Sequence, residues 1–328
     1  MKRALTASLL LLAASTVGLE PACAEQPKPL PRIAYVYLYR IGPTAPFVDA
    51  FDARLRELGW INGKTIDVTY RDANASPEKL AAIMRELVDS KIDLIVSVCT
   101  PETMAARKAT STIPIVVAAS GDLAATGLIA SYARPGGNVT GISGLVLEQS
   151  VKRMEILKEA FPAVAQATVV WNPVRPDNKV EVAAMQSAAL AKGLRLDSQQ
   201  VRDRDEVDVA LDVMTKERTQ ALTETGDPFL YDQAQRLVDF AAELRIPAIY
   251  DNRAFVDAGG LMSFGVNLPK QHARAAEYVD KILRGAKPAD LPIWQPSEYE
   301  LVINLKTAKA LGMTIPQSLL VRANDVIH

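Results

Sequence analysis

The sequence predicts an α/β protein with two doubly wound, Rossmann-like domains, each built on a parallel sheet. Short apolar runs without period-two alternation recur along the chain, as in strands that are covered on both faces. Helix-like segments separate these runs, and the alternation restarts after residue 160, which indicates a second domain with the same plan. The length of 328 residues suits two domains of about 100–150 residues each.

The first half of the chain contains five predicted strands with helices between them. Phe51, Leu55 and Leu58 recur at helical spacing, and Gly59 follows them as a typical helix end. Ser76 is a preferred N-cap residue for the second helix. The predicted strands are 33–38, 66–70, 94–98, 113–119 and 139–143. The predicted helices are 47–58, 77–88, 104–108 and 123–132.

The second half repeats the alternation and ends in a mixed tail. Pro162, Gly193 and Gly285 mark the ends of three of its helices. The predicted strands are 168–171, 194–201, 220–223, 247–250, 261–266 and 299–303. The predicted helices are 150–160, 180–192, 203–214, 231–244 and 270–283, with short ones near 306–311 and 316–319.

Strands 94–98 and 113–119 form the most informative unit of the chain. The connection between them has the length of a right-handed crossover, so we expect the two strands to be parallel neighbours. Their polar ends then lie side by side at the carboxyl edge of the sheet, where open α/β sheets bind ligands. The candidate binding residues of this domain are Thr100, Pro101, Ser120, Gly121 and Asp122, with Tyr39 after the first strand.

The second domain carries a similar set of residues after its own strands. These candidates are Asn172, Thr225, Asp227, Tyr250, Asp251 and Arg253. Two facing edges of this kind form the walls of a small-molecule cleft, and their helix N-termini suit an anion such as a carboxylate. A second interpretation stays open at this point, in which each Asp or Asn caps the next helix and Tyr250 packs in the core.

Recognisable catalytic machinery is absent from the sequence. His272 lies in a predicted surface helix and His328 is the last residue, so we expect neither to act in chemistry. No nucleophile elbow, P-loop, G-x-G-x-x-G motif or metal-ligand spacing occurs, which predicts no metal, no cofactor and no enzymatic activity. A secreted enzyme that pairs cleft carboxylates is the less favoured alternative. The net charge of −1 argues against binding of nucleic acid.

Residues 1–24 are predicted to be a secretory signal peptide. Basic residues precede an apolar stretch, and Ala22-Cys23-Ala24 gives a cleavage site before Glu25. A membrane anchor and a lipid attached to Cys23 are the alternatives. After cleavage, residues 25–32 form an extended tether, and Cys99 is the one remaining thiol, so we expect no internal disulfide. This pattern places the mature protein in the periplasm.

Five stretches of the chain resemble the substrate-binding proteins of bacterial ABC importers, and in particular their tryptophan- and tyrosine-binding members. They are 51–73 (FDARLRELGWINGKTIDVTYRDA), 92–117 (IDLIVSVCTPETMAARKATSTIPIVV), 127–144 (GLIASYARPGGNVTGISG), 245–267 (RIPAIYDNRAFVDAGGLMSFGVN) and 275–327. The resemblance implies a type I periplasmic-binding-protein fold with a hinge of three crossovers. The first lobe would comprise 33–145 and 268–290, and the second 146–267 and 291–328. The crossovers would lie near 143–147, 266–269 and 291–296.

The resemblance also implies a function. A monomer would capture a small solute between its lobes, with an amino acid or aromatic-type solute favoured, and would deliver it to a membrane permease with its ATPase. A sensor module that docks on a membrane receptor is the alternative of the same fold. The residues named above at the strand ends would be the binding loops. The chain departs from the family pattern at Cys99, where a small glycine-like residue is usual, and at the polar segment Glu224-Thr225-Gly226.

Overall fold

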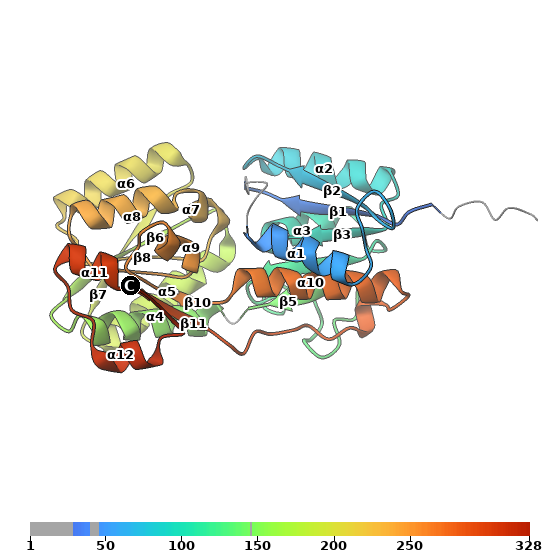
Figure 1. Ribbon diagram of the computed structural model, residues 1–328. Coiled ribbons are helices and arrows are strands. Elements are labelled where there is room, and N and C mark those ends of the chain that lie inside the picture. Colours follow the sequence, from blue (N-terminus) through green and yellow to red (C-terminus); the bar gives the residue numbers. More distant parts are fainter. Residues whose placement is uncertain (1–28, 40–45, 145) are drawn as a thin grey trace, which may run out of the picture.

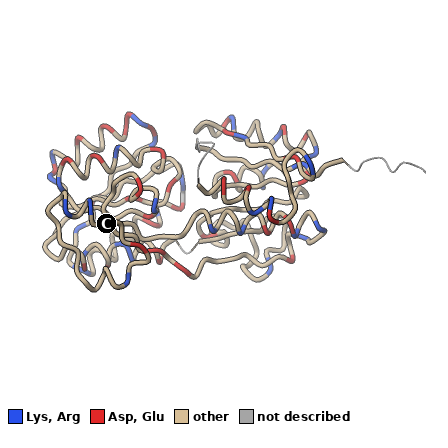
Figure 2. Tube along the Cα trace, in the orientation of Figure 1, with Lys and Arg blue, Asp and Glu red and all other residues tan. Residues whose placement is uncertain are grey.

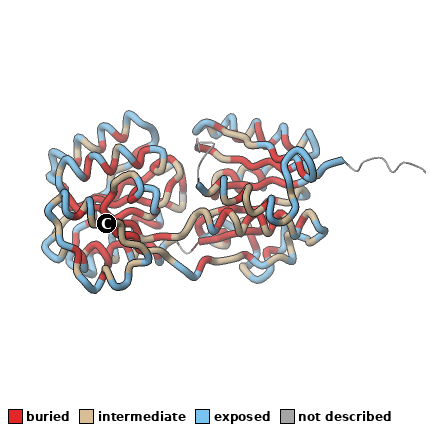
Figure 3. Tube along the Cα trace, viewed as in Figure 1, coloured by how far each residue is buried: buried red, intermediate tan, exposed pale blue. Residues whose placement is uncertain are grey.

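The computed structural model describes residues 29–39, 46–144 and 146–328, which form two α/β lobes joined by crossing segments (Figure 1). The predicted signal peptide and the first half of the predicted tether, residues 25–28, lie outside the described residues. Figure 3 shows the buried residues concentrated along the sheets of each lobe, whereas the outer helices carry the exposed ones. Each lobe therefore has its own apolar core.

The first lobe contains a five-stranded parallel sheet in the order β2-β1-β3-β4-β5. Its strands are β1 (Arg32–Tyr37), β2 (Asp67–Asp72), β3 (Leu94–Ser97), β4 (Ile115–Ser120) and β5 (Val139–Ser143). Its helices are α1 (Pro46–Glu57), α2 (Pro77–Asp89), α3 (Thr100–Ala109) and, from later in the chain, α10 (Leu268–Leu283), with the short helix η1 (Pro288–Asp290). The five predicted strands of this half are all present. The crossover from β3 through α3 to β4 is also as predicted.

The predicted helix at 123–132 is wrong, because this segment forms turns. The Asp122 carboxylate accepts hydrogen bonds of 2.9 Å from the backbone N–H groups of Ala124 and Ala125, and Gly127 has a φ of 71°. These features favour turns over a continuing helix. Helix α10 covers the opposite face of the sheet, packing against α1, β4 and β5 (Figure 1). The fully buried Ala275 and Ala276 allow it to come close to its neighbours.

The second lobe contains a seven-stranded sheet in the order β12-β11-β10-β9-β8-β6-β7. Its strands are β6 (Gln166–Trp171), β7 (Arg195–Gln200), β8 (Leu222–Glu224), β9 (Ala248–Tyr250), β10 (Met262–Gly265), β11 (Glu300–Asn304) and β12 (Asp325–Ile327). Its helices are α4 (Val146–Ala160), α5 (Pro176–Ala191), α6 (Arg204–Lys216), α7 (Pro228–Asp232), α8 (Ala234–Glu243), α9 (Arg253–Asp257), α11 (Leu305–Leu311) and α12 (Gln317–Arg322). Strand β12 was not predicted, and β10 pairs with β11 antiparallel, so this sheet is not wholly parallel as predicted.

The polypeptide crosses between the lobes three times, after β5, after β10 and before β11. In the third crossing the chain stays on the first lobe through Trp294. The Trp294 backbone N–H donates to Gly141 O at 2.9 Å, and Ser143 N–H donates to Trp294 O at 3.0 Å. This segment therefore extends the edge of β5 before it leaves the first lobe, within the range 291–296 where the third crossover was expected.

Basic and acidic residues are both spread over the two lobes of the described chain (Figure 2). Within the residues that the structure describes, no helix has the length and apolar character needed to cross a bilayer.

Candidate ligand-binding site

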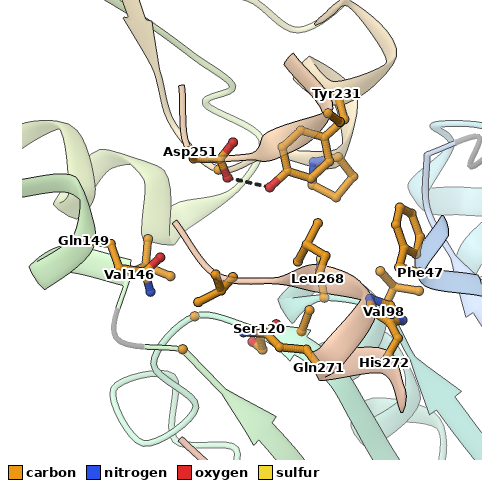
Figure 4. A pocket seen from close by; sticks show the side chains of 18 of the residues that line it. Phe47, Val98, Ser120, Val146, Gln149, Tyr231, Asp251, Leu268, Gln271 and His272 are labelled. Atoms are coloured by element: carbon orange, nitrogen blue, oxygen red, sulfur yellow. Dashed lines mark hydrogen bonds between the residues drawn. The ribbon is translucent and has the colours of Figure 1, made fainter. Parts of the chain in front are cut away.

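A cavity of about 310 Å³ lies between the two lobes, next to the hinge (Figure 4). The first lobe contributes Phe47 at the start of α1, Val98 and Cys99 after β3, and Ser120 at the end of β4. Leu268 and His272 on α10 also belong to the first lobe, and the second lobe completes the cavity with Gln149, Arg153, Arg175, Tyr231 and Asp251. Its volume is at the lower end of the roughly 300–1,000 Å³ typical of small-molecule sites.

The wall from the second lobe carries charged groups of both signs, with Asp251, Arg153 and Arg175 in its lining. The Asp251 backbone N–H donates to Glu224 Oε1 at 2.7 Å, and the Tyr231 hydroxyl donates to Asp251 Oδ2 at 2.6 Å (Figure 4). Asp251 Oδ1 and Glu224 Oε2 are buried and have no donor among the described residues. Burial, the charge of Asp251 and a hydrogen bond to its carboxyl raise the pKa of Glu224 well above its ordinary value. Burial therefore favours the neutral form of the Glu224 carboxyl.

Arg153 supports this wall from α4. Its guanidinium is 1 % exposed, and its Nη2 donates to Glu181 Oε1 at 3.0 Å, to Ser150 Oγ at 3.0 Å and to Glu224 O at 3.2 Å. Burial raises the pKa of Glu181, and the charge of Arg153 opposes that rise. The ion pair thus fixes α4, α5 and the end of β8 against one another at the cavity.

Arg175 holds the loop that follows β8. Its Nη2 donates to Asp177 Oδ2 at 2.7 Å, and its Nη1 donates to Gly226 O at 2.8 Å. The buried Asp227 lies 3.8 Å from the same guanidinium and also accepts the backbone N–H of Phe229 at 2.8 Å. Asp227 is therefore both a helix cap and a partner of Arg175.

The cavity wall from the first lobe carries fewer charged side chains. Glu102 accepts the backbone N–H groups of Leu38 at 2.6 Å and Cys99 at 3.2 Å, so one buried carboxyl holds the loops after β1 and β3. Burial raises the pKa of the Cys99 thiol well above its ordinary value, so Cys99 presents a neutral thiol to the cavity. Ser120 Oγ lies 2.7 Å from Thr100 Oγ1. Apolar side chains, including Phe47 and Val98, supply the rest of this wall.

The two lobes also contact each other directly through residues that do not line the cavity. Asn172 Nδ2 donates to Tyr39 Oη at 2.8 Å, and the rings of Tyr39 and Phe229 pack with centroids 5.8 Å apart. Thr100 Oγ1 donates to Asp177 Oδ2 at 3.4 Å. The structure thus has its two lobes in contact.

The structure brings together only part of the set of residues chosen from the sequence. Ser120, Gly121 and Asp251 line the cavity. Tyr39, Thr100 and Asn172 lie where the lobes touch. Asp122 is exposed and caps the turn after it, at an outer groove that also includes Thr100, Met104 and Val180. Pro101 lies in the first turn of α3 and lines neither of these two spaces.

The remaining candidates of the second lobe point elsewhere. Thr225 and Asp227 are fully buried behind the cavity wall. Tyr250 packs in the core with its ring stacked on Phe255 at 4.5 Å, as in the alternative interpretation. Arg253 is exposed and pairs with Asp325 at 2.6 Å and Asp257 at 3.3 Å, so its side chain is held on the outer surface.

Sequence reasoning missed several residues of the cavity. These residues all lie on helices, whereas the sequence pattern points to strand ends; they are Phe47, Gln149, Arg153, Tyr231 and His272. His272 is 1 % exposed, so the expectation of a surface position is wrong. Its neighbours at helical spacing, including Ala275 and Ala276, are apolar, and that pattern could have revealed the buried face of α10.

Comparison with known proteins agrees with this architecture. The family described as ABC transporter substrate binding protein matches residues 45–327. A tyrosine-binding protein of Clostridioides difficile is 27% identical over 263 residues, covering 80% of this chain and 75% of that protein. A domain from Streptococcus pneumoniae, solved in complex with L-Trp, is 25% identical with a TM-score of 0.84, covering 91% of this chain and 100% of that chain. A conserved domain protein from Vibrio cholerae is 27% identical with a TM-score of 0.82, covering 90% and 99%.

The solved structures share the two-lobed type I periplasmic-binding-protein fold. With a match over most of its length and a solute-sized cavity between two lobes, this chain belongs to the ABC transporter substrate-binding protein family and is a solute-binding component.

Proposed function

We propose that the protein captures an amino acid with an aromatic side chain and delivers it to an ABC permease. The observation that carries the proposal is the cavity itself, which joins a charged wall with Asp251 and Arg153 to an apolar wall at Phe47. Similarity to a tyrosine-binding protein and to a domain bound to L-Trp supports the same class of solute. An amino acid needs both environments, because it is charged at one end and apolar at the other.

The polar end of the solute is proposed to lie near Asp251. An α-ammonium group is a donor that matches the Asp251 carboxylate, whose buried Oδ1 has no donor among the described residues. The amide Nε2 of Gln149 is a buried donor without a partner among the described residues, and it suits the α-carboxylate. Ser120 and Gly121 are proposed to contact the solute from the first lobe.

The ring of the solute is proposed to lie against the first lobe. Phe47, Val98 and Leu268 provide apolar surface there (Figure 4). Aromatic and aliphatic walls with a few polar groups are the usual lining of small-molecule sites. Tyr39, Thr100 and Asn172 are proposed to act in closure, because their side chains join one lobe to the other.

Export and docking complete the proposal. The mature chain is proposed to begin at Glu25 in the periplasm, after removal of residues 1–24. One chain supplies both walls of the cavity, which supports action as a monomer. A solute that contacts both lobes binds the closed form more tightly than the open form and so favours closure. The permease would bind that closed form.

Replacing Asp251 by Asn is expected to weaken binding of an aromatic amino acid by about 10- to 100-fold, the loss of a charge-assisted hydrogen bond. Isothermal titration calorimetry on the mature chain measures this change. Asp257→Asn is the matched control, because that carboxylate is 54% exposed on the same lobe. Equal affinities for Asp251→Asn and the wild type would show that the ammonium group is not bound at Asp251.

Replacing Tyr39 by Phe is expected to weaken the same binding by about 2- to 10-fold, since one neutral hydrogen bond of the closed form is lost. Small-angle scattering should show a larger radius of gyration for the variant at partial saturation. Tyr132→Phe is the control, because that hydroxyl donates to Asp122 within the first lobe. An unchanged affinity for Tyr39→Phe would remove Tyr39 from the closure mechanism.

A further inference from the structure

His272 occupies an unusual place for a titratable side chain. It lies on α10, is 1 % exposed, and forms part of the cavity wall (Figure 4). Its Nδ1 is 2.6 Å from the hydroxyl of Tyr35 on β1, and its ring packs on Phe47 with centroids 4.8 Å apart. Since Nδ1 is engaged with Tyr35, Nε2 is the ring nitrogen left for the cavity.

The hydroxyl of Tyr35 decides which nitrogen carries the proton. Tyr35 is fully buried, and its hydroxyl has no hydrogen-bond partner other than His272 Nδ1 among the described residues. If Nδ1 carried the proton, the Tyr35 hydroxyl would accept it and its own proton would be buried without an acceptor. The hydroxyl therefore donates to Nδ1, and the imidazole proton sits on Nε2.

Both members of this pair are neutral. Burial lowers the pKa of His272 to about 3, and burial raises the pKa of the Tyr35 hydroxyl well above its ordinary value. Tyr35 contributes no charge, so the ring acts as a hydrogen-bond donor of fixed direction.

We propose that His272 is a specificity-determining residue whose Nε2–H donates to an acceptor atom on the ring of the bound solute, with Tyr35 fixing the tautomer. The inference rests on the proposed function. Asp251 and His272 come from different lobes and lie on opposite sides of the cavity (Figure 4). A solute anchored by its ammonium group at Asp251 therefore directs its ring toward His272 and Phe47.

The position of His272 across the cavity from Asp251 indicates which class of solute binds. A phenol oxygen at the far end of the ring can accept from Nε2–H, whereas a bare phenyl ring would leave that donor buried and unpaired. Sites built to bond a substrate hydroxyl reject the analogue that lacks it. The structure thus favours an aromatic amino acid with a hydroxyl on the ring over one without it.

The binding arm of the test compares L-tyrosine with L-phenylalanine by isothermal titration calorimetry on the mature chain. The wild type is expected to prefer L-tyrosine by about tenfold or more. The double variant Tyr35→Phe/His272→Leu removes both partners, so neither is left unpaired, and its preference is expected to fall to about twofold or less. A preference that is absent in the wild type, or that survives in the double variant, overturns the inference and leaves the proposed function standing.

The spectroscopic arm needs no solute. Nitrogen-15 NMR of the histidine-labelled chain is expected to show a single tautomer for His272, protonated on Nε2, with the exposed His328 as internal reference. Tyr35→Phe is expected to add the other tautomer. A proton on Nδ1 in the wild type overturns the inference, whatever the chain binds. If the wild type binds no aromatic amino acid, the proposed function fails, and the inference about its solute fails with it.

Discussion

Replacing Arg153 by Met is expected to lower the free energy of unfolding by about 3–5 kcal/mol, because removal of one partner leaves a buried charge uncompensated. Glu181 is 3% exposed and would lose its ion pair at 3.0 Å. The carbonyl oxygen of Glu224 would also lose a donor. Urea unfolding of the mature variant at pH 7, followed by circular dichroism, measures the change.

Two further variants test whether the buried pair is the cause. Arg322→Met breaks the ion pair with Glu159, whose side chains are 45% and 36% exposed, and is expected to cost at most about 1 kcal/mol. The double variant Arg153→Met/Glu181→Met should recover much of the loss, since no buried charge is left unpaired. If Arg153→Met costs no more than Arg322→Met, the buried pair does not hold α4 and α5 at the cavity.

Replacing Gly265 by Ala is expected to destabilise the protein by about 3 kcal/mol or more, at the upper end of the cost of overpacking. A Cβ at this position would lie 1.7 Å from the backbone oxygen of Asp251 and 2.8 Å from its carbonyl carbon. Both neighbours are backbone atoms, so β10 would have to move away from the end of β9. Asp251 lines the cavity, and this shift should also weaken solute binding by about 100-fold or more.

Gly137→Ala is the matched control for this substitution. A Cβ at Gly137 meets no atom within 4 Å, and Gly137 does not have a positive φ. Its melting temperature and affinity should stay close to those of the wild type. If Gly265→Ala matched Gly137→Ala in both measurements, the close approach of β10 to Asp251 would not matter to the site.

The fold was predictable because its strands are covered on both faces, and such strands appear in the sequence as uninterrupted apolar runs. The segment at 94–98 is such a run, and the structure has β3 there with four fully buried residues. The errors fall where tertiary contacts override local pattern. The segment 123–132 has helical spacing but is held in turns by Asp122, and β12 is too short to stand out in the sequence.

The site was predictable only at the strand ends. Ser120 and Asp251 follow strands at the expected edge, and both line the cavity. Arg153 and His272 could not be assigned in this way, because a helical residue faces the cavity only through the packing of its helix. From the sequence alone, an arginine at position 153 is expected on the solvent-exposed side of its helix. Only the structure shows that Arg153 is buried and paired with Glu181.

The central claim is that the two lobes bind one amino acid between them and leave it unchanged. Calorimetric titration of residues 25–328 with the full set of proteinogenic amino acids, followed by mass spectrometry of the recovered solute, tests it directly. The account predicts saturable one-to-one binding of at least one aromatic amino acid, recovered intact. Absence of saturable binding for every aromatic member, or recovery of a chemically altered solute, would contradict it.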